Sequence, residues 1–450
     1  MAGTMRGSAI LSLALALTLG ALFAPPSAEA QLARERTERE WAVKLEKLET
    51  MLQPFMEKHG IDMWIIYTRE NDPDPLIQLF GDYINTASGH RNTYIFYDPG
   101  EGRPLERTAL GTHIRGHILP FFPDTPGYGH GYGEEGLAPH LREYVQERDP
   151  QVIAINRSRT ITMVDGLSLE GYNYLVEALG PEYEARFVSA EPLAIDYIAH
   201  RTPAELEISI EASWITWHLL RRAFSNEVIT PGVTTNEDVM FWLNDQVQKQ
   251  QLELNFATSV TIRRPGEQGS FSVHEAEVIQ PGDMLHTDFG IKLMGIGTDQ
   301  QKQTYVLRPG ETEPPAGIQT LFAQSVRMAE IIADELKPGV LGRDVKARAE
   351  ARGLEEGINN LVYSHSQGSW VHDAGAWAIY DWPERYGNHP REPVRPTEFW
   401  SVEFSVTGEI PEWGDQTLSL GREEDGWVGE DGTFHWMAGP QTELWTVRSY

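Results

Sequence analysis

The most informative part of this chain is the segment GDMLHTDFG, residues 282–290, which is followed by IKLMGIGTD, residues 291–299. A tight turn at Leu293 and Met294 would place Asp288 directly opposite Asp299 on two antiparallel strands, with their side chains about 5 Å apart on one face. Two like charges at this separation repel, so the pair calls for a counter-cation, and a divalent metal ion suits oxygen ligands. The alternative for two isolated aspartates is that one is exposed or caps a turn.

Three later segments add candidate ligands. The segment SHSQGSWVHD, residues 364–373, holds His365 and His372 seven residues apart. Glu403 lies in the expected strand SVEFS, residues 401–405, and Glu423 and Glu424 lie in the acidic run REED, residues 422–425. Four carboxylates and one neutral imidazole carry a charge of about −4, which two divalent ions would balance around a bridging hydroxide. The residue types therefore favour a dinuclear metal centre.

Composition narrows the chemistry further. The 450 residues contain no cysteine, which excludes disulfides, thiolate nucleophiles and thiolate metal sites, so that any metal must be bound by His, Asp and Glu. With 37 basic and 66 acidic residues the net charge is −29, which argues against nucleic acid and anionic membranes as partners. At 40% hydrophobic residues the chain has enough apolar surface for large cores.

The first thirty residues have the pattern of an export signal. Arg6 precedes an apolar run over residues 9–24, and Ala28-Glu29-Ala30 resembles a signal peptidase site. The run is short for a membrane span and is followed by two prolines. We therefore expect residues 1–30 to be a signal peptide and the mature protein to be periplasmic or secreted.

Residues 31–195 are expected to form a mixed α/β domain and residues 196–450 a second domain. In the first, helical spacing of apolar residues ends at Gly60, before an expected strand over residues 61–67. In the second, Thr202-Pro203-Ala204-Glu205 predicts a helix start with a capping box, and Thr234 to Glu237 predicts another. Strands are then expected up to residue 307, helices over 317–336 and 342–357, and further strands around 401–406 and 416–423.

The order Asp, Asp, His, Glu, Glu, with Gly282-Asp283 ahead of it and a second histidine seven residues after the first, resembles the pita-bread metallopeptidases. This family includes Xaa-Pro aminopeptidase, prolidase, methionine aminopeptidase and creatinase. The resemblance is good over about residues 200–450 and looser before them. It implies an α/β (α+β) fold in which a creatinase-like N-terminal domain precedes a pita-bread catalytic domain, with an antiparallel sheet and flanking helices.

The resemblance also implies the metal ligands. They would be Asp288, Asp299, His365, Glu403 and one of the adjacent acids Glu423 and Glu424. Counting back from the closing segment GEDG, residues 429–432, selects Glu423 without a gap, whereas one deleted residue would select Glu424. Two divalent ions are implied, with Mn ranked first and Zn or Co as alternatives.

Several residues depart from the family pattern. Lys302 stands where the family usually has Arg, and serines flank His365 where it usually has glycines. His274 resembles the active-site histidine that precedes Gly-Asp, but lies closer to it than usual, and a surface loop histidine is the alternative. His286 shares a strand face with Asp288, and we rank a role as hydrogen-bonding partner of the site above roles as an extra ligand or an unrelated polar residue.

The resemblance implies that the chain would hydrolyse the Xaa-Pro bond of small proline-containing peptides with a metal-activated hydroxide, as an aminopeptidase or a dipeptidase. Glu403 would carry a proton to the leaving nitrogen, His372 would contact the substrate carbonyl, and His274 would be a second donor. Rival interpretations are a catalytically silent peptide-binding module and a creatinase-type amidinohydrolase. The oligomeric state is open, with a homodimer among the expected forms.

Overall fold

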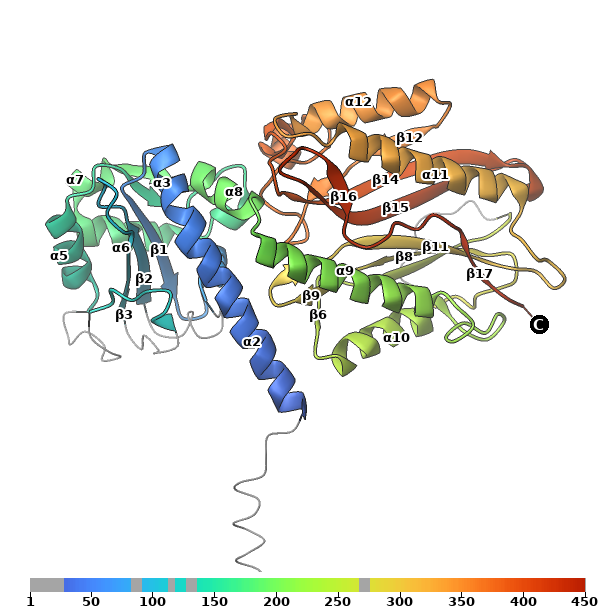
Figure 1. Ribbon diagram of the computed structural model, residues 1–450, viewed down its shortest axis with the longest axis horizontal. Helices are drawn as coiled ribbons and strands as arrows, with labels where there is room; N and C mark the ends of the chain where they lie inside the picture. Colours follow the sequence, from blue (N-terminus) through green and yellow to red (C-terminus); the bar gives the residue numbers. More distant parts are fainter. Residues whose placement is uncertain (1–27, 82–90, 112–117, 127–135, 267–275, 450) are drawn as a thin grey trace, which may run out of the picture.

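The computed structural model describes residues 28–81, 91–111, 118–126, 136–266 and 276–449. The apolar run expected to be an export signal and His274 lie outside these ranges. Within them, no helix combines the length and the apolar character that crossing a membrane requires. The chain folds into two parts, each built around its own sheet (Figure 1).

The N-terminal part is a five-stranded mixed sheet with helices on both faces. The strand order is β3-β2-β1-β4-β5, in which β1 pairs antiparallel with β2 and parallel with β4. The strands are β1 Met63–Arg69, β2 Arg91–Tyr97, β3 Glu106–Gly111, β4 Ile153–Ile155 and β5 Phe187–Ser189. The helices are α2 Ala28–Lys47, α3 Gln53–His59, α5 Ala138–Arg148, α6 Leu169–Leu179, α7 Pro181–Glu184 and α8 Glu191–Ala199, with a π-helical turn over Leu48–Leu52.

Strand β1 is buried on both faces because alternate residues enter two separate cores. Trp64 and Ile66 pack with α3 and α8, whereas Met63 and Ile65 pack with α5 and α6. Since side chains alternate across a strand, a continuous apolar run is what a central strand covered on both faces requires. The expected α/β character of this part is confirmed, and α3 ends as predicted at Gly60, whose φ of 62° is left-handed.

The second part begins at helix α9, Pro203–Ala223, with the predicted capping box. The Thr202 hydroxyl accepts from the Glu205 amide at 3.2 Å, and the Glu205 carboxylate accepts from the Thr202 amide at 2.8 Å. The second predicted box is wrong by one residue. Helix α10, Asn236–Lys249, is capped by Thr235 with Asp238, because Asp can replace Glu at the third helical position.

The sheet of the second part has nine strands in the order β12-β14-β15-β11-β8-β7, with β13, β16 and β17 added at β14, β15 and β11. Helices α9 and α10 lie on one side and α11, Ala316–Glu335, and α12, Gly342–Glu355, on the other (Figure 1). The strands are β7 Ser259–Arg263, β8 Met284–Phe289, β11 Gln300–Val306, β12 Asn360–Val362, β13 His365–Ser366, β14 Phe399–Ile410, β15 Gln416–Val428, β16 Phe434–Trp436 and β17 Trp445–Val447. Shorter elements are β6 Glu253–Leu254, β9 Ile291–Leu293, β10 Ile296–Gly297 and α13 Pro383–Tyr386.

The predicted register between Asp288 and Asp299 is wrong by two residues. The hairpin turns at Met294 and Gly295, both with positive φ, and Leu293 pairs with Ile296. Asp288 therefore lies opposite Gln301. Moving a two-residue turn by one position along the chain shifts every strand pair by two residues. Because side chains alternate between the two faces with a period of two, such a shift leaves each side chain on the same face. The two aspartates consequently share a face as predicted, but they are diagonal neighbours.

Buried ion pairs join the two parts close to the site. Lys47, at the end of α2, donates to Glu205 at 2.9 Å, and Arg201 donates to Glu205 at 3.1 Å. Arg201 also pairs with Asp373, the residue after His372. The N-terminal part thus helps to anchor the segment that carries His372.

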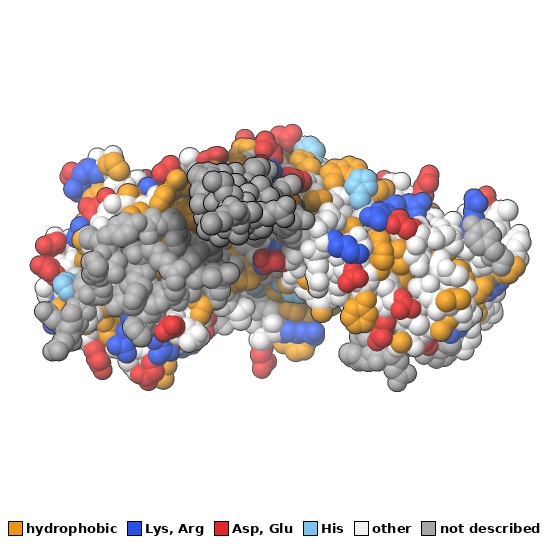
Figure 2. Space-filling view, turned by 90° about the horizontal axis from the view of Figure 1, so that it is seen from below, with side chains coloured by type: hydrophobic (Ala, Val, Ile, Leu, Met, Phe, Trp, Pro, Cys, Tyr) orange, Lys and Arg blue, Asp and Glu red, His pale blue; other side chains and the backbone are white. Residues whose placement is uncertain are grey.

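Acidic and basic side chains are interspersed on the face of the molecule shown in Figure 2. The net charge of −29 is therefore not gathered into one acidic patch on that face. A solvated, solubilising role suits this distribution.

Candidate metal centre and active site

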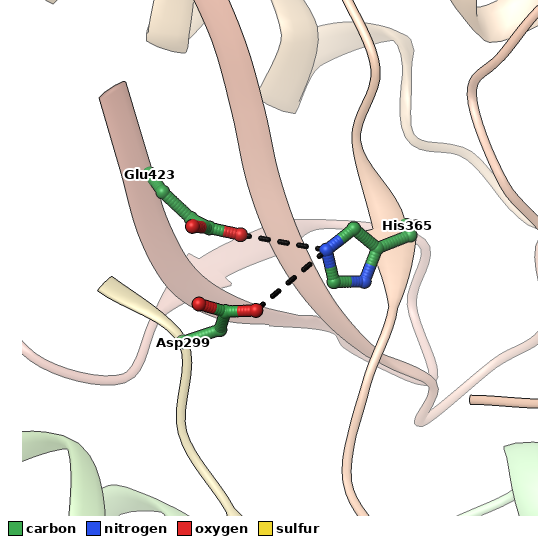
Figure 3. Close-up of side chains that lie close together, drawn as sticks. All are labelled: Asp299, His365 and Glu423. Carbon is green, nitrogen blue, oxygen red and sulfur yellow. Dashed lines mark ion pairs between the residues drawn. The ribbon is translucent and has the colours of Figure 1, made fainter. Parts of the chain in front are cut away.

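Three of the predicted ligands converge at one point of the catalytic sheet. Nε2 of His365 lies 3.4 Å from a Glu423 carboxylate oxygen and 3.8 Å from an Asp299 carboxylate oxygen (Figure 3). One ligand atom from each of these residues lies within 4.8 Å of the others, and all three residues are buried. This is a cluster of the kind that holds a metal ion.

The strand pairing brings Glu403 and Asp288 to the same place. Glu403 on β14 lies directly opposite Glu423 on β15, and its Oε2 is 3.8 Å from Nε2 of His365. Gln301 on β11 pairs with Glu423 on one side and with Asp288 on the other. The predicted ligands therefore share one face of the sheet, with Asp288 on β8, His365 on β13, Glu403 on β14, Glu423 on β15 and Asp299 just before β11.

Burial, followed by the charges of neighbouring acids, raises the pKa values of the clustered carboxylates. Burial and the charge of Glu423 raise the pKa of Asp288 to about 8, and burial raises that of Glu423 to about 7. Burial, followed by the charges of Glu423 and Asp288, raises the pKa values of Asp299 and Glu403 well above their ordinary range. A group of acids that disfavour their own ionised state is what a bound cation would stabilise.

His365 presents a free nitrogen to these acids. Its Nδ1 is 3.1 Å from the Ser366 carbonyl oxygen, which can only accept, so Nδ1 carries the proton. Burial lowers the pKa of His365 to about 4, which keeps the ring neutral at physiological pH. Nε2 is then a lone-pair donor of the form that binds metals.

The donor set fits a divalent metal ion. Among the described residues, Nε2 of His365 and Oδ1 of both Asp288 and Asp299 are buried without a hydrogen-bond partner. Buried polar atoms normally have hydrogen-bond partners, so three such atoms with free lone pairs at one point fit the binding of a cation. Carboxylate oxygens and a neutral imidazole are ligands that Mn, Zn and Co accept.

Glu424 lies on the opposite face of β15 from Glu423, as the alternation of side chains requires. Its carboxylate accepts from Lys302 at 2.5 Å and from Arg422 at 3.1 Å. Lys302, which replaces the usual Arg, is therefore engaged with Glu424 and is fully buried. Of the two acids that the sequence left open, Glu423 is the one beside His365.

His372 lies at the wall of a pocket that opens onto the cluster. Its ring centroid is 4.4 Å from that of His365, in an edge-to-face arrangement. The pocket measures about 330 Å³, and both histidines and Glu403 line it. Burial, followed by the nearby His365, lowers the pKa of His372 to about 3, so its ring is neutral.

Supporting residues hold the acids in place. Asp425 accepts from the Asp299 amide at 3.0 Å and from the side chains of Gln300 and Gln367. Ser364, which stands where the family usually has glycine, donates to the Glu403 carbonyl and accepts from its amide. The serine is therefore part of the strand pairing beneath the site.

Three contributing residues were not singled out from the sequence. Gln301 contacts Glu403, Asp425 contacts Asp299, and Arg385 lines the pocket. The period of two along a strand could have identified Gln301, since it shares a face with Asp299. Arg385 lies on the short helix α13, and no pattern connected it to the site. His286, ranked as a hydrogen-bonding partner of the site, contacts Gln301.

Comparisons with known proteins agree with this geometry. Residues 209–430 match metallopeptidase family M24, whereas no curated protein sequence matches the chain. The structure resembles an X-Pro aminopeptidase from Thermotoga maritima with a TM-score of 0.60 at 16% identity, covering 88% of this chain and 100% of that one. It resembles an Xaa-Pro dipeptidase from Bacillus anthracis with a TM-score of 0.60 at 19% identity, covering 90% and 99%. A dipeptidase PepE from Mycobacterium ulcerans gives a TM-score of 0.61 at 15% identity, covering 90% and 98%.

The structural matches span nearly the whole of both chains, which confirms the predicted arrangement of an N-terminal domain followed by a pita-bread catalytic domain. The match to M24 covers the stretch from α9 through the acids of β15. Residues 209–430 belong to metallopeptidase family M24, and the chain as a whole has the fold of the pita-bread peptidases.

Proposed function

We propose that this chain is an exported, metal-dependent peptidase that hydrolyses the Xaa-Pro bond of small peptides. The observation that carries the proposal is the convergence of Asp299, His365 and Glu423 beside a pocket that His372 and Glu403 line. Membership of M24 supports peptidase chemistry. The preference for proline rests on the resemblance to Xaa-Pro peptidases together with the character of the pocket.

Five residues would hold the metal, with Asp288 and Glu403 completing the cluster of Asp299, His365 and Glu423. Four carboxylates accommodate two divalent ions by charge, and Mn remains the first choice. When bound, such ions lower the pKa of water and polarise the peptide carbonyl.

We assign to Glu403 the transfer of a proton between the cluster and the pocket. Its side chain is 18% exposed, whereas those of Asp299 and Glu423 are at most 5% exposed. Oε1 is held by Gln301, while Oε2 points toward His365. Glu403 can therefore accept a proton on the cluster side and deliver it to the leaving nitrogen.

We assign to His372 the binding of the reacting carbonyl. A neutral imidazole keeps one N–H, and the low pKa of His372 ensures this state at physiological pH. The ring lines the pocket next to His365, where a donor would meet the developing negative charge on the carbonyl oxygen. His274, proposed as a second donor, lies outside the described residues.

The pocket suits a proline ring and a free carboxylate. Aromatic and aliphatic side chains make up most of its lining: Leu361, Val362, Tyr363, Trp377, Ile379, Tyr380 and Tyr386. Arg385 is the cation of this lining, and within the described part of the chain its guanidinium forms no ion pair. A short substrate with its carboxyl terminus near Arg385 would supply the missing charge.

Metal reconstitution followed by peptide assays tests the proposal. The metal-free protein should gain activity with Mn, and Xaa-Pro dipeptides should be compared with Xaa-Pro-Yaa tripeptides and with Xaa-Ala controls. Amidating the carboxyl terminus should weaken binding if Arg385 recognises it, and Arg385→Gln should remove that difference. A protein that binds no divalent ion and cleaves none of these peptides would favour the silent module, and cleavage of creatine would favour the creatinase-type alternative.

Export is a separate part of the proposal, supported by the residue pattern of positions 1–30. Expression of the full chain with its own N-terminus should release a protein that begins at Gln31. Light scattering on that protein would test the homodimer.

A further inference from the structure

Glu403 is held at one oxygen by a side chain that the proposed mechanism does not use. Nε2 of Gln301 donates to Oε1 of Glu403 at 2.7 Å, and Oε1 of Gln301 lies 3.0 Å from Nε2 of His286. A carboxylate that a bound cation keeps ionised only accepts hydrogen bonds, so in that state the amide nitrogen of Gln301 faces Glu403 and its oxygen faces His286. His286 must then carry its proton on Nε2. Its Nδ1 is 3.5 Å from the Thr261 hydroxyl.

Gln301 lies on the strand between those of Asp288 and Glu423, and as a neutral amide it cannot act as a charged ligand. It pairs with Asp288 on one neighbouring strand and with Glu423 on the other, and it is 5% exposed. A neutral amide at this position adds no charge to the carboxylates around it. Its polar ends are directed to Glu403 and His286.

The neighbouring strand leaves space for this contact. A Cβ on Gly421 would lie 2.9 Å from Oε1 of Gln301 and 3.1 Å from Nε2 of His286. A side chain there would press on the pair at the point where its two polar atoms meet. Gly421 on β15 pairs with Ser405 in regular strand geometry, so the backbone itself does not require glycine there. What the glycine provides is the space for Gln301 and His286.

We propose that Gln301 is a positioning residue that fixes the Glu403 carboxylate, and that His286 acts through Gln301 by setting the orientation of its amide. This inference rests on the proposed function. With Oε1 held by Gln301, the other carboxylate oxygen is directed toward His365 and the ligand cluster. Without the donor on His286, the amide can turn its oxygen toward Glu403, where two acceptors would repel.

The test compares Gln301→Leu with Gln303→Leu. Gln303 lies on the same strand two residues later and donates to the Gly421 carbonyl, so its substitution removes a buried amide that does not contact Glu403. Metal-free proteins are titrated with Mn²⁺ by calorimetry, and kcat and KM are measured on an Xaa-Pro dipeptide. Gln301→Leu should lose about 10–100-fold in Mn²⁺ affinity or kcat, and Gln303→Leu should stay near wild type.

A double-mutant cycle tests the dependence of His286 on Gln301. His286→Phe should lower the same quantity in the wild-type background and change nothing further in Gln301→Leu, while His286→Gln should restore much of the loss by keeping an N–H donor. Gly421→Ala should lower it by crowding the pair without removing a polar group. The melting temperature of each metal-free variant shows whether a loss merely follows reduced stability.

The inference is overturned if Gln301→Leu matches Gln303→Leu in both measurements, or if His286→Phe costs as much in Gln301→Leu as in the wild type. Mn²⁺ titration needs no substrate, so it tests the role of Gln301 separately from the proposed peptidase function. A wild type that binds Mn²⁺ but does not cleave Xaa-Pro peptides refutes the proposed function, and the affinity cycle still decides the role of Gln301. A wild type that binds no divalent ion refutes both.

Discussion

Replacing Glu423 with glutamine should abolish metal binding and stabilise the metal-free protein, whereas the same change at the adjacent Glu424 should destabilise the protein and leave metal binding unchanged. Glu423 lies 3.4 Å from the free nitrogen of His365, among other carboxylates. Glu424 faces the other side of the sheet, where it pairs with Lys302 and Arg422. The same chemical change therefore removes a proposed metal ligand in one case and a buried counter-ion in the other.

The structure gives a magnitude for Glu423→Gln in the metal-free protein. Burial raises the pKa of Glu423 from 4.5 to about 7. Because the folded value exceeds the unfolded value, this group favours folding at acid pH and loses that contribution as the pH rises from 4.5 to 7. Above pH 7 the ionised group costs about 3 kcal/mol, since each pKa unit corresponds to about 1.4 kcal/mol. Glu423→Gln should therefore stabilise the metal-free protein by up to this amount while abolishing turnover.

Glu424→Gln should instead destabilise the protein and leave the metal site intact. The Lys302 side chain has no exposed surface and that of Arg422 is 1% exposed, so the substitution leaves two buried cations without a carboxylate between them. Breaking a buried pair in this way typically costs about 3–5 kcal/mol. The five predicted metal ligands are unchanged, so the stoichiometry of bound Mn²⁺ should equal that of the wild type.

Urea denaturation of both metal-free variants at pH 8 measures the stability changes, and Mn²⁺ titration of the same samples measures the sites. Denaturation at pH 5 is the internal control, because the gain from Glu423→Gln should shrink there. Loss of Mn²⁺ binding in Glu424→Gln with full binding in Glu423→Gln would refute the reasoning and move the ligand to Glu424.

Three further predictions concern other parts of the molecule. His372→Ala should keep both metal ions and lose about 10²–10³ in kcat, and a fall in metal stoichiometry would show that His372 is a ligand. Asp196→Asn should cost about 1.5–3 kcal/mol at pH 7. Burial alone would raise the pKa of Asp196, but the hydrogen bond from Lys58 and the charge of Arg395 hold it below its ordinary 3.8. The loss of stability should therefore be full above pH 3.8 and shrink as the pH falls below that value. Equal denaturation curves for the variant and the wild type at pH 7 would contradict this. Gly375→Ala would place a Cβ against the Glu398 carboxylate and Ser366. The resulting shift of the segment between His372 and Trp377 should lower both the melting temperature and kcat. A variant that melts like the wild type would show that this segment accommodates the methyl group without loss of stability.

Local sequence patterns were sufficient to predict the main helices and strands and to identify most candidate metal ligands. The capping box at Thr202 and the glycine that ends α3 act through neighbouring residues, so the chain shows them directly. The order of the acids and His365 was likewise visible, because a metal centre requires particular residue types. The cap at Thr235 was missed by one residue because Thr234 and Thr235 offer the same hydroxyl.

Contacts between distant strands required the tertiary structure. The residue that pairs with Asp288 depends on whether the hairpin turns at Met294 and Gly295. A turn one residue earlier would shift every pair of the hairpin by two residues. Glu423 becomes distinct from Glu424 when β15 pairs with β14 and β11, segments that lie far away in the chain.

Gln301 illustrates the same limit most clearly. Its amide is unremarkable in the sequence, and its neighbours Glu403 and His286 are 102 and 15 residues away. Residue types and spacing identify groups that bind metal, because that chemistry belongs to single side chains. Which oxygen of a carboxylate is held, and by what, depends on atoms that meet only when the sheet forms, and so could not be inferred from the order of residues.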